Sequence, residues 1–157
     1  MRKWSLEHVG NGALLRDLQA LAAQDFVHLA KLLAHIGEVQ VRKLYRDAAQ
    51  PDMRSYCVNV LRFSEDAAGK RIHVAGVARR IPALLDAIAE GRLHLSGACE
   101  IAAHLTEENA GQLLATVTHK TREQIRVVVA SLAPRPDLPE RIAPIPLEQG
   151  TGLDWRR

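Results

Sequence analysis

The stretch ALLRDLQALAAQDFVHLAKLLAHI, residues 13–36, decides the fold. Its apolar side chains recur every three or four residues, which is the spacing of one face of an α-helix. The members of this apolar stripe are Leu15, Leu18, Ala22, Phe26, Leu29, Leu33 and Ile36. The stripe predicts one long helix over residues 13–49, because Gln50-Pro51 is a strong stop signal. At 1.5 Å per residue this helix is about 50 Å long, unless Gly37 bends it.

The apolar face of such a helix must be covered, either by later helices of the same chain or by another chain. We expect packing within the chain to cover it. The alternative is an association surface that pairs this helix with a second copy or with a separate nuclease chain. The residues of that surface are Leu15, Leu18, Phe26, Leu29, Leu33 and Ile36.

The remaining sequence predicts an all-α fold, a multi-helix bundle. Alternation with a period of two residues is missing, and Ala, Leu, Glu, Arg and Gln dominate. Further helix starts are expected from cap signals at Asp52, Ser64, Pro82, Ser96, Thr106 and Thr121, which makes seven helices with the long one. Gly91 is the expected left-handed residue after the helix that Pro82 begins.

Composition divides the 157 residues into three parts. Residues 1–12 are an N-terminal extension, residues 13–133 are one helical domain, and residues 134–157 are an irregular tail with five of the seven prolines. A domain of this size buries a sufficient core without disulfides or metals. We therefore expect Cys57 and Cys99 to be reduced thiols.

Several function classes find no support in the sequence. Apolar runs reach only four or five residues, far short of the ~20 that cross a bilayer, and the N-terminus lacks the apolar centre of a signal peptide. We therefore expect a cytoplasmic protein without membrane contact. The seven histidines are at least seven residues apart, and no phosphate-binding glycine loop or nucleophile motif occurs. We expect no catalytic residue, no metal and no cofactor.

Residues 53–81 have the spacing of a helix-turn-helix, with a short helix, a turn at Ser64-Glu65-Asp66 and a second helix rich in cations. Residues 69–80 hold four Lys or Arg side chains and no acids, a pattern that favours phosphate contact. The predicted contacts to duplex DNA are Arg62, Lys70, Arg71, Arg79, Arg80 and Arg92. A solvated surface helix has similar charges, and the net charge of +3 is mild. Contacts to base edges are not expected.

Collinear stretches within residues 12–146 carry a further pattern. The main ones are LRFSEDAA at 61–68, AEGRLHLS at 89–96 and HLTEENA at 104–110. They resemble the N-terminal helical region found in many bacterial HNH-endonuclease proteins. The resemblance implies a recognition or assembly module, while a C-terminal HNH unit of that family carries the metal-dependent nuclease. Residues 147–157 contain neither histidine nor cysteine, so we expect a truncated or separately encoded module. A second alternative is a fragment of an HNH nuclease that is inactive on its own.

A weaker likeness involves Leu61–Ala68, the basic helix, Pro82 and the segment Glu90-Gly91-Arg92. Their order is similar to the helix-turn-helix region of chromosome-partitioning ParB proteins. In that region a scaffold helix and a recognition helix are separate. Only 17 residues lie between Ser64 and Pro82 here, so the likeness requires a turn near Gly69 or Gly76.

Overall fold

The computed structural model describes residues 3–132, and in this range every regular element is helical. The elements are α1 (Asn11–Arg42), the 3₁₀ segment η1 (Leu44–Ala48), α2 (Met53–Asn59), α3 (Glu65–Arg80), α4 (Ala83–Ala89), α5 (Leu95–Ala102), α6 (Ala110–Val117) and α7 (Arg122–Leu132). The predicted all-α class and the seven α-helices are confirmed. The Pro-rich tail predicted for residues 134–157 lies outside the described residues.

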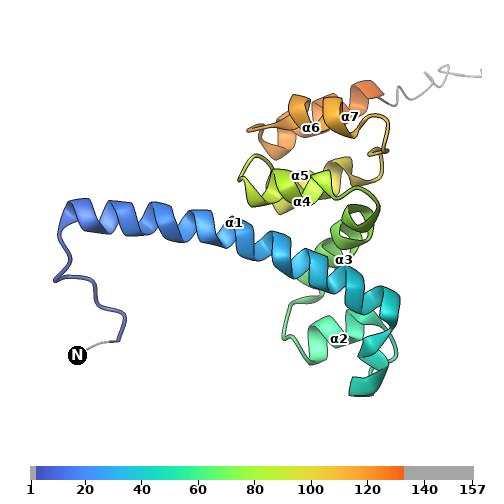
Figure 1. The fold of residues 1–157 in the computed structure, drawn as a ribbon, viewed down its shortest axis with the longest axis horizontal. Helices are drawn as coiled ribbons and strands as arrows, with labels where there is room; N and C mark the ends of the chain where they lie inside the picture. Colours follow the sequence, from blue (N-terminus) through green and yellow to red (C-terminus); the bar gives the residue numbers. More distant parts are fainter. Residues whose placement is uncertain (1–2, 133–157) are drawn as a thin grey trace, which may run out of the picture.

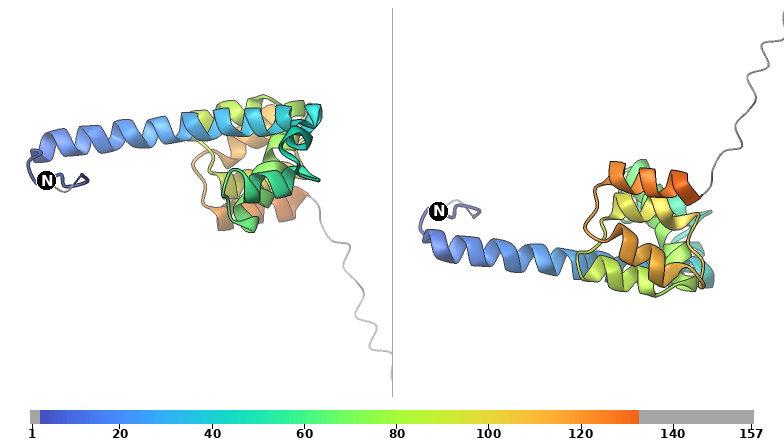
Figure 2. Two further views of the ribbon diagram at one scale, coloured as in Figure 1. Left: turned by 90° about the horizontal axis from the view of Figure 1, so that it is seen from below. Right: turned by 90° about the horizontal axis from the view of Figure 1, so that it is seen from above.

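The molecule consists of a helical body and one projecting helix (Figure 1). Helices α3 and α4 pack against the C-terminal half of α1, and α5, α7 and α6 follow on the far side. Helix α2 lies under the C-terminal end of α1, against α3. The N-terminal half of α1 extends beyond the body in every view (Figure 2). We use "body" for residues 26–132 and "arm" for residues 11–25.

The core lies where α1 crosses α3 and α4. Fully buried side chains come from all the larger helices of the body, among them Leu33, Leu84, Ile88, Ile101 and Ile125. Gly37 does not bend α1, which continues to Arg42. A Cβ atom at Gly37 would lie 3.2 Å from the backbone oxygen of Ala75 in α3. Glycine at this position therefore lets the two backbones approach closely.

The apolar stripe of α1 has two environments. Leu33 and Ile36 are buried in the core, so packing within the chain is confirmed for the C-terminal half of the stripe. Phe26 and Leu29 are half-buried, and the Phe26 ring lies 6.0 Å from the His94 ring. By contrast, Leu15 and Leu18 on the arm remain about 60% exposed, at 60% and 61%. Only the N-terminal half of the predicted association surface is therefore open to another chain.

The predicted end of the long helix is wrong. Helix α1 has 32 residues and ends at Arg42, because Lys43 adopts a left-handed backbone with φ 55°. The Lys43 N–H donates to the Gln40 carbonyl oxygen at 3.2 Å, and the chain continues as η1 rather than as an α-helix. This turn brings Tyr45 back against the core. A continued α-helix would not make this turn, and Pro51 lies well after the break.

The cap predictions have mixed outcomes. Asp52 and Ser64 each accept a hydrogen bond from the backbone N–H three residues later, and Thr121 forms a reciprocal capping box with Gln124. Gly91 is left-handed, as predicted, with φ +71°. The predicted starts at Ser96 and Thr106 are wrong, since α5 begins at Leu95 and α6 at Ala110. Thr106 exchanges two hydrogen bonds with Asn109 and so closes a separate turn before α6.

Candidate nucleic-acid interface

The helix-turn-helix-like segment consists of α2, a short connection and α3, and the two helices pack together. In the connection, the Phe63 N–H donates to the Cys57 carbonyl oxygen at 3.0 Å, and Arg62 has a left-handed backbone with φ 65°. Helix α3 runs for 16 residues through both Gly69 and Gly76. The turn that a ParB-like arrangement requires is therefore missing from this helix.

Three of the six predicted DNA contacts form ion pairs with carboxylates of the same fold. Lys70 Nζ lies 2.7 Å from Asp66 Oδ2, and Arg92 Nε lies 2.6 Å from Glu90 Oε2. Arg79 pairs with Glu38 of α1, which also binds Arg42. These hydrogen bonds from Arg42 and Arg79 hold the pKa of Glu38 below its usual value. A phosphate at these three cations must compete with a carboxylate that is already present.

Arg71 has a packing role. Its guanidinium carbon lies 5.0 Å from the centroid of the Phe63 ring, a cation–π distance. Its Nη1 donates to the Ala67 carbonyl oxygen at 3.3 Å, while the buried Nε has no hydrogen-bond partner among the described residues. The side chain thus joins α3 to the α2–α3 connection, and less of it is free to contact a ligand.

The two remaining predicted contacts, Arg62 and Arg80, are exposed. Within residues 3–132 neither of them forms an ion pair. They lie at opposite ends of α3, Arg62 just before it and Arg80 as its last residue. The structure therefore does not gather the six cations into one continuous site.

The structure draws attention to cations that lie before α3. Residues 42–62 contain five Lys or Arg and two Asp, a local net charge of 5 − 2 = +3. We define the basic corner as Lys43, Arg46, Arg54 and Arg62, which are all exposed and without an ion pair in the described part of the chain. They lie on η1, on α2 and in the connections that flank them, and η1 contacts both α1 and α2. A charge count over this window finds the cluster in the sequence, but residues 69–80 showed the higher density.

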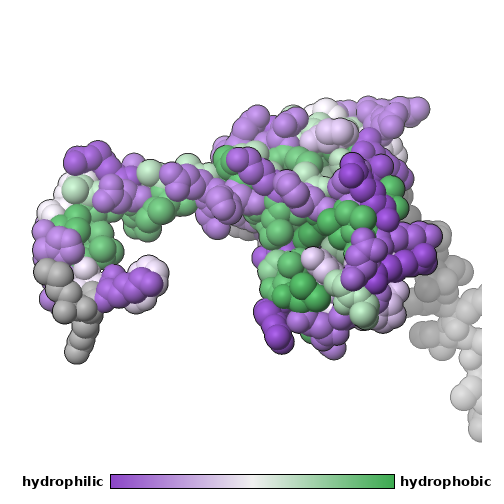
Figure 3. Space-filling model, turned by 60° about the horizontal axis from the view of Figure 1, so that its bottom comes forward, coloured by the Kyte–Doolittle hydropathy of each residue, from purple (hydrophilic) through white to green (hydrophobic). Residues whose placement is uncertain are grey.

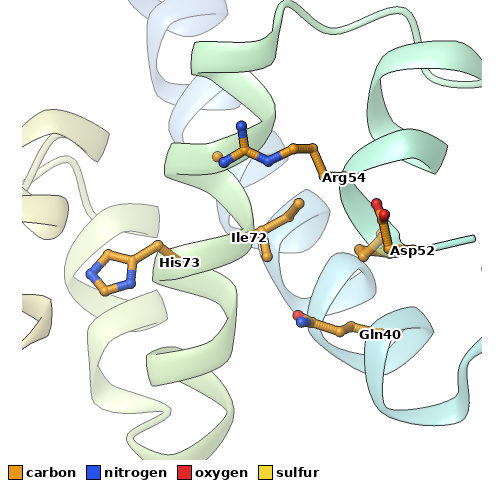
Figure 4. A pocket seen from close by; sticks show the side chains of 7 residues that line it. Gln40, Asp52, Arg54, Ile72 and His73 are labelled. Atoms are coloured by element: carbon orange, nitrogen blue, oxygen red, sulfur yellow. The ribbon is translucent and has the colours of Figure 1, made fainter.

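A shallow hollow of about 470 Å³ adjoins the basic corner between α1, α2 and α3. Gln40, Asp52, Arg54, Gly69 and Ile72 contribute to its walls. Figure 4 shows Arg54 reaching from α2 across to α3. Its Nη2 lies 2.9 Å from the point that a Cβ atom on Gly69 would occupy, so the missing side chain makes room for the guanidinium.

Asp52 is the acid of this hollow, and its role is structural. Its carboxylate accepts the Ser55 backbone N–H at 2.7 Å and caps α2. Hydrogen bonding from Ser55 holds the pKa of Asp52 below its usual value. The cap also aligns the first turn of α2, where Arg54 is located, and one carboxylate offsets part of the positive charge nearby.

Other chemistry is sparse in residues 3–132. No group of three His, Cys, Asp or Glu side chains there could hold a metal ion. Cys57 and Cys99 are both free, and burial raises the pKa of both thiols. None of the described helices combines the length and apolar character needed to cross a bilayer.

The chain was compared with family models, curated proteins and solved structures. None of them matches. The resemblance to the helical region of HNH-endonuclease proteins therefore stays a prediction.

Proposed function

We propose that the chain is a non-catalytic helical module of an HNH-endonuclease-type bacterial protein, acts in the cytoplasm, and contacts duplex DNA through phosphates. The observation that carries the DNA contact is the basic corner, in which four exposed cations have no carboxylate partner among the described residues. Unpaired cations bind phosphate without first breaking an ion pair. Phosphate contacts of this kind give affinity and orientation but no sequence reading.

The charge at the start of α3 favours the basic corner, rather than α3, as the surface that contacts DNA. A recognition helix brings its N-terminal residues to the bases. Here the first turn of α3 carries Glu65 and Asp66, which repel phosphates. Both acids are exposed. Contact through η1, α2 and Arg62 leaves this acidic turn at the edge of the interface.

The test is binding of a short DNA duplex, measured by fluorescence anisotropy at several salt concentrations. The variant Lys43→Gln/Arg46→Gln removes two cations of the basic corner. We expect weaker binding and a slope of log K against log salt that is smaller by about 2, close to one unit for each lost phosphate contact.

Two matched variants make the result specific, because each also removes two positive charges. Arg16→Gln/Lys31→Gln changes exposed cations of α1 away from the basic corner, and it should leave the slope unchanged. Lys70→Gln/Arg79→Gln changes ion-paired cations of α3 and should have a smaller effect than the corner variant. No binding at low salt, or equal losses in all three variants, would show that the proposal is wrong.

A further inference from the structure

No residue of the arm is buried. The arm projects from the body and carries four exposed leucines, Leu14 at 37%, Leu15 at 60%, Leu18 at 61% and Leu21 at 61%. Figure 3 shows hydrophobic residues gathered on this projecting half of α1. At 100° per residue these leucines lie within an arc of about 120°, so they form one face. An exposed apolar face on a projecting helix marks a protein contact.

We propose that two copies of this chain pair through their arms, antiparallel and centred on Leu18. In this register residue i of one arm lies opposite residue 36 − i of the other. Leu18 then meets Leu18 of the second copy, Leu15 meets Leu21, and Leu14 meets Ala22. Every exposed leucine of the arm is covered by an apolar residue.

The register also fits the shape of the chain. Phe26 is the point at which α1 meets the body, and it falls opposite residue 10, just before the partner's helix begins. The two bodies therefore lie at opposite ends of the paired arms. About 15 residues of each helix overlap, a contact about 22 Å long.

Charge favours the antiparallel over the parallel arrangement. Helix α1 begins at Asn11 without a side-chain cap and without an acidic residue in its first turn, so its N-terminal N–H groups lack a negative partner. Asp25 is exposed and lies on the leucine face, and 36 − 25 places it opposite Asn11 of the second copy. A carboxylate is stabilised at a helix N-terminus. Parallel pairing in register would instead place Asp25 beside Asp25.

The contact is small. Standard protein interfaces use about 20–30 residues on each side, far more than one face of the arm supplies. We therefore expect a dimer that forms and dissociates with concentration. The proposal is independent of DNA binding, and the experiments are done without DNA.

The first experiment is sedimentation equilibrium of the full chain over a range of concentrations. The wild type should shift from monomer to dimer, whereas Leu18→Asp should stay monomeric. The matched control is Ala20→Asp, an equal charge change on the opposite, exposed face of the arm, which should still dimerise. Circular dichroism should show both variants folded. A wild type that is monomeric throughout, a larger oligomer, or equal loss in both variants overturns the proposal.

The second experiment tests orientation. Asp25→Asn should weaken the dimer about 3- to 30-fold, because two carboxylate contacts to helix N-termini are lost for each dimer. Parallel pairing predicts the opposite, since the change would remove a repulsion. Cysteines away from the centre give a second readout: a mixture of the Leu15→Cys and Leu21→Cys chains should form an interchain disulfide under mild oxidation, while Leu15→Cys alone should not. A tighter dimer of Asp25→Asn, or a disulfide formed by Leu15→Cys alone, contradicts the antiparallel register.

Discussion

Gly37 shows how a single residue sets the distance between two helices. Its missing side chain lets α1 approach the Ala75 carbonyl of α3, and a Cβ atom there would meet backbone rather than a movable side chain. Gly76 lies in the middle of α3 but faces open space, with nothing within 4 Å of a Cβ atom. Glycine therefore favours stability at position 37, where a side chain would clash, and lowers it at position 76, where a side chain would fit.

We expect Gly37→Leu to lower the free energy of unfolding by about 1–3 kcal/mol, because the larger side chain overpacks the α1–α3 contact. Gly76→Ala should raise it by up to about 1 kcal/mol through helix propensity alone. Urea unfolding followed by circular dichroism measures both. A Gly37→Leu variant as stable as the wild type would contradict the close approach of the two backbones.

Which cations are free could be predicted from the sequence only in part. The Asp66–Lys70 pair has the i, i+4 spacing that forms ion pairs on a helix, so the sequence alone could predict this pair. The Glu38–Arg79 pair joins residues 41 apart in sequence, and only the packing of α1 on α3 brings them together. The stacking of Arg71 on Phe63 likewise requires the folded connection.

At the scale of helices, α5 and α7 are joined by one carboxylate. Glu100 accepts hydrogen bonds from Arg122 Nε at 2.7 Å and from Arg126 Nε at 3.2 Å. The hydrogen bond from Arg122, with that from Arg126, lowers the pKa of Glu100. A carboxyl group whose pKa is lower in the folded than in the unfolded state stabilises the fold at pH values above its unfolded-state pKa. This contribution is lost as the pH falls through the folded-state pKa.

Glu100→Gln should therefore be less stable than the wild type at neutral pH, and the difference should shrink as pH falls below the ordinary value of 4.5. Thermal unfolding at several pH values measures this dependence. Glu107→Gln is the control, since Glu107 is exposed and has no ion pair in residues 3–132. A Glu100→Gln deficit that persists unchanged at pH 3 would argue against the ion-pair cause.

Helix existence was easier to predict than helix ends. The caps at Asp52, Ser64 and Thr121 depend on contacts within four residues, which the sequence displays directly. After α1 ends at Arg42, the half-buried Tyr45 packs against the core, a contact with residues that are distant in the sequence. Local patterns cannot contain that information, so the predicted helix extended to residue 49.

At the scale of the whole molecule, the apolar stripe of α1 has two environments that the sequence does not distinguish: its C-terminal half is packed in the core, and its N-terminal half is exposed. Leu33 is completely buried, while Leu15 is 60% exposed, although both have the same place in the stripe. Periodicity identifies an apolar face but cannot tell where along the helix the body ends. The arm therefore became visible only in the structure.

These two environments predict different losses of stability when a leucine of the stripe is replaced by alanine. Leu33→Ala should lower the free energy of unfolding by about 2–5 kcal/mol, since it leaves a cavity in the core. Leu15→Ala should change it by less than about 0.5 kcal/mol when the chain is monomeric, because substitutions at exposed positions usually have small effects. Denaturant unfolding at low protein concentration measures both. Similar losses in the two variants would indicate that the arm folds back on the body.

The unbroken course of α1 has a mechanical consequence. A single helix runs from Asn11 at the tip to Arg42 inside the body, with Gly37 seated directly on α3. A flexible linker would let the body tumble freely around whatever holds the tip. Here the tip and the core share one axis, so a molecule that grips the tip also fixes the direction in which the rest of the protein points, as a lever does.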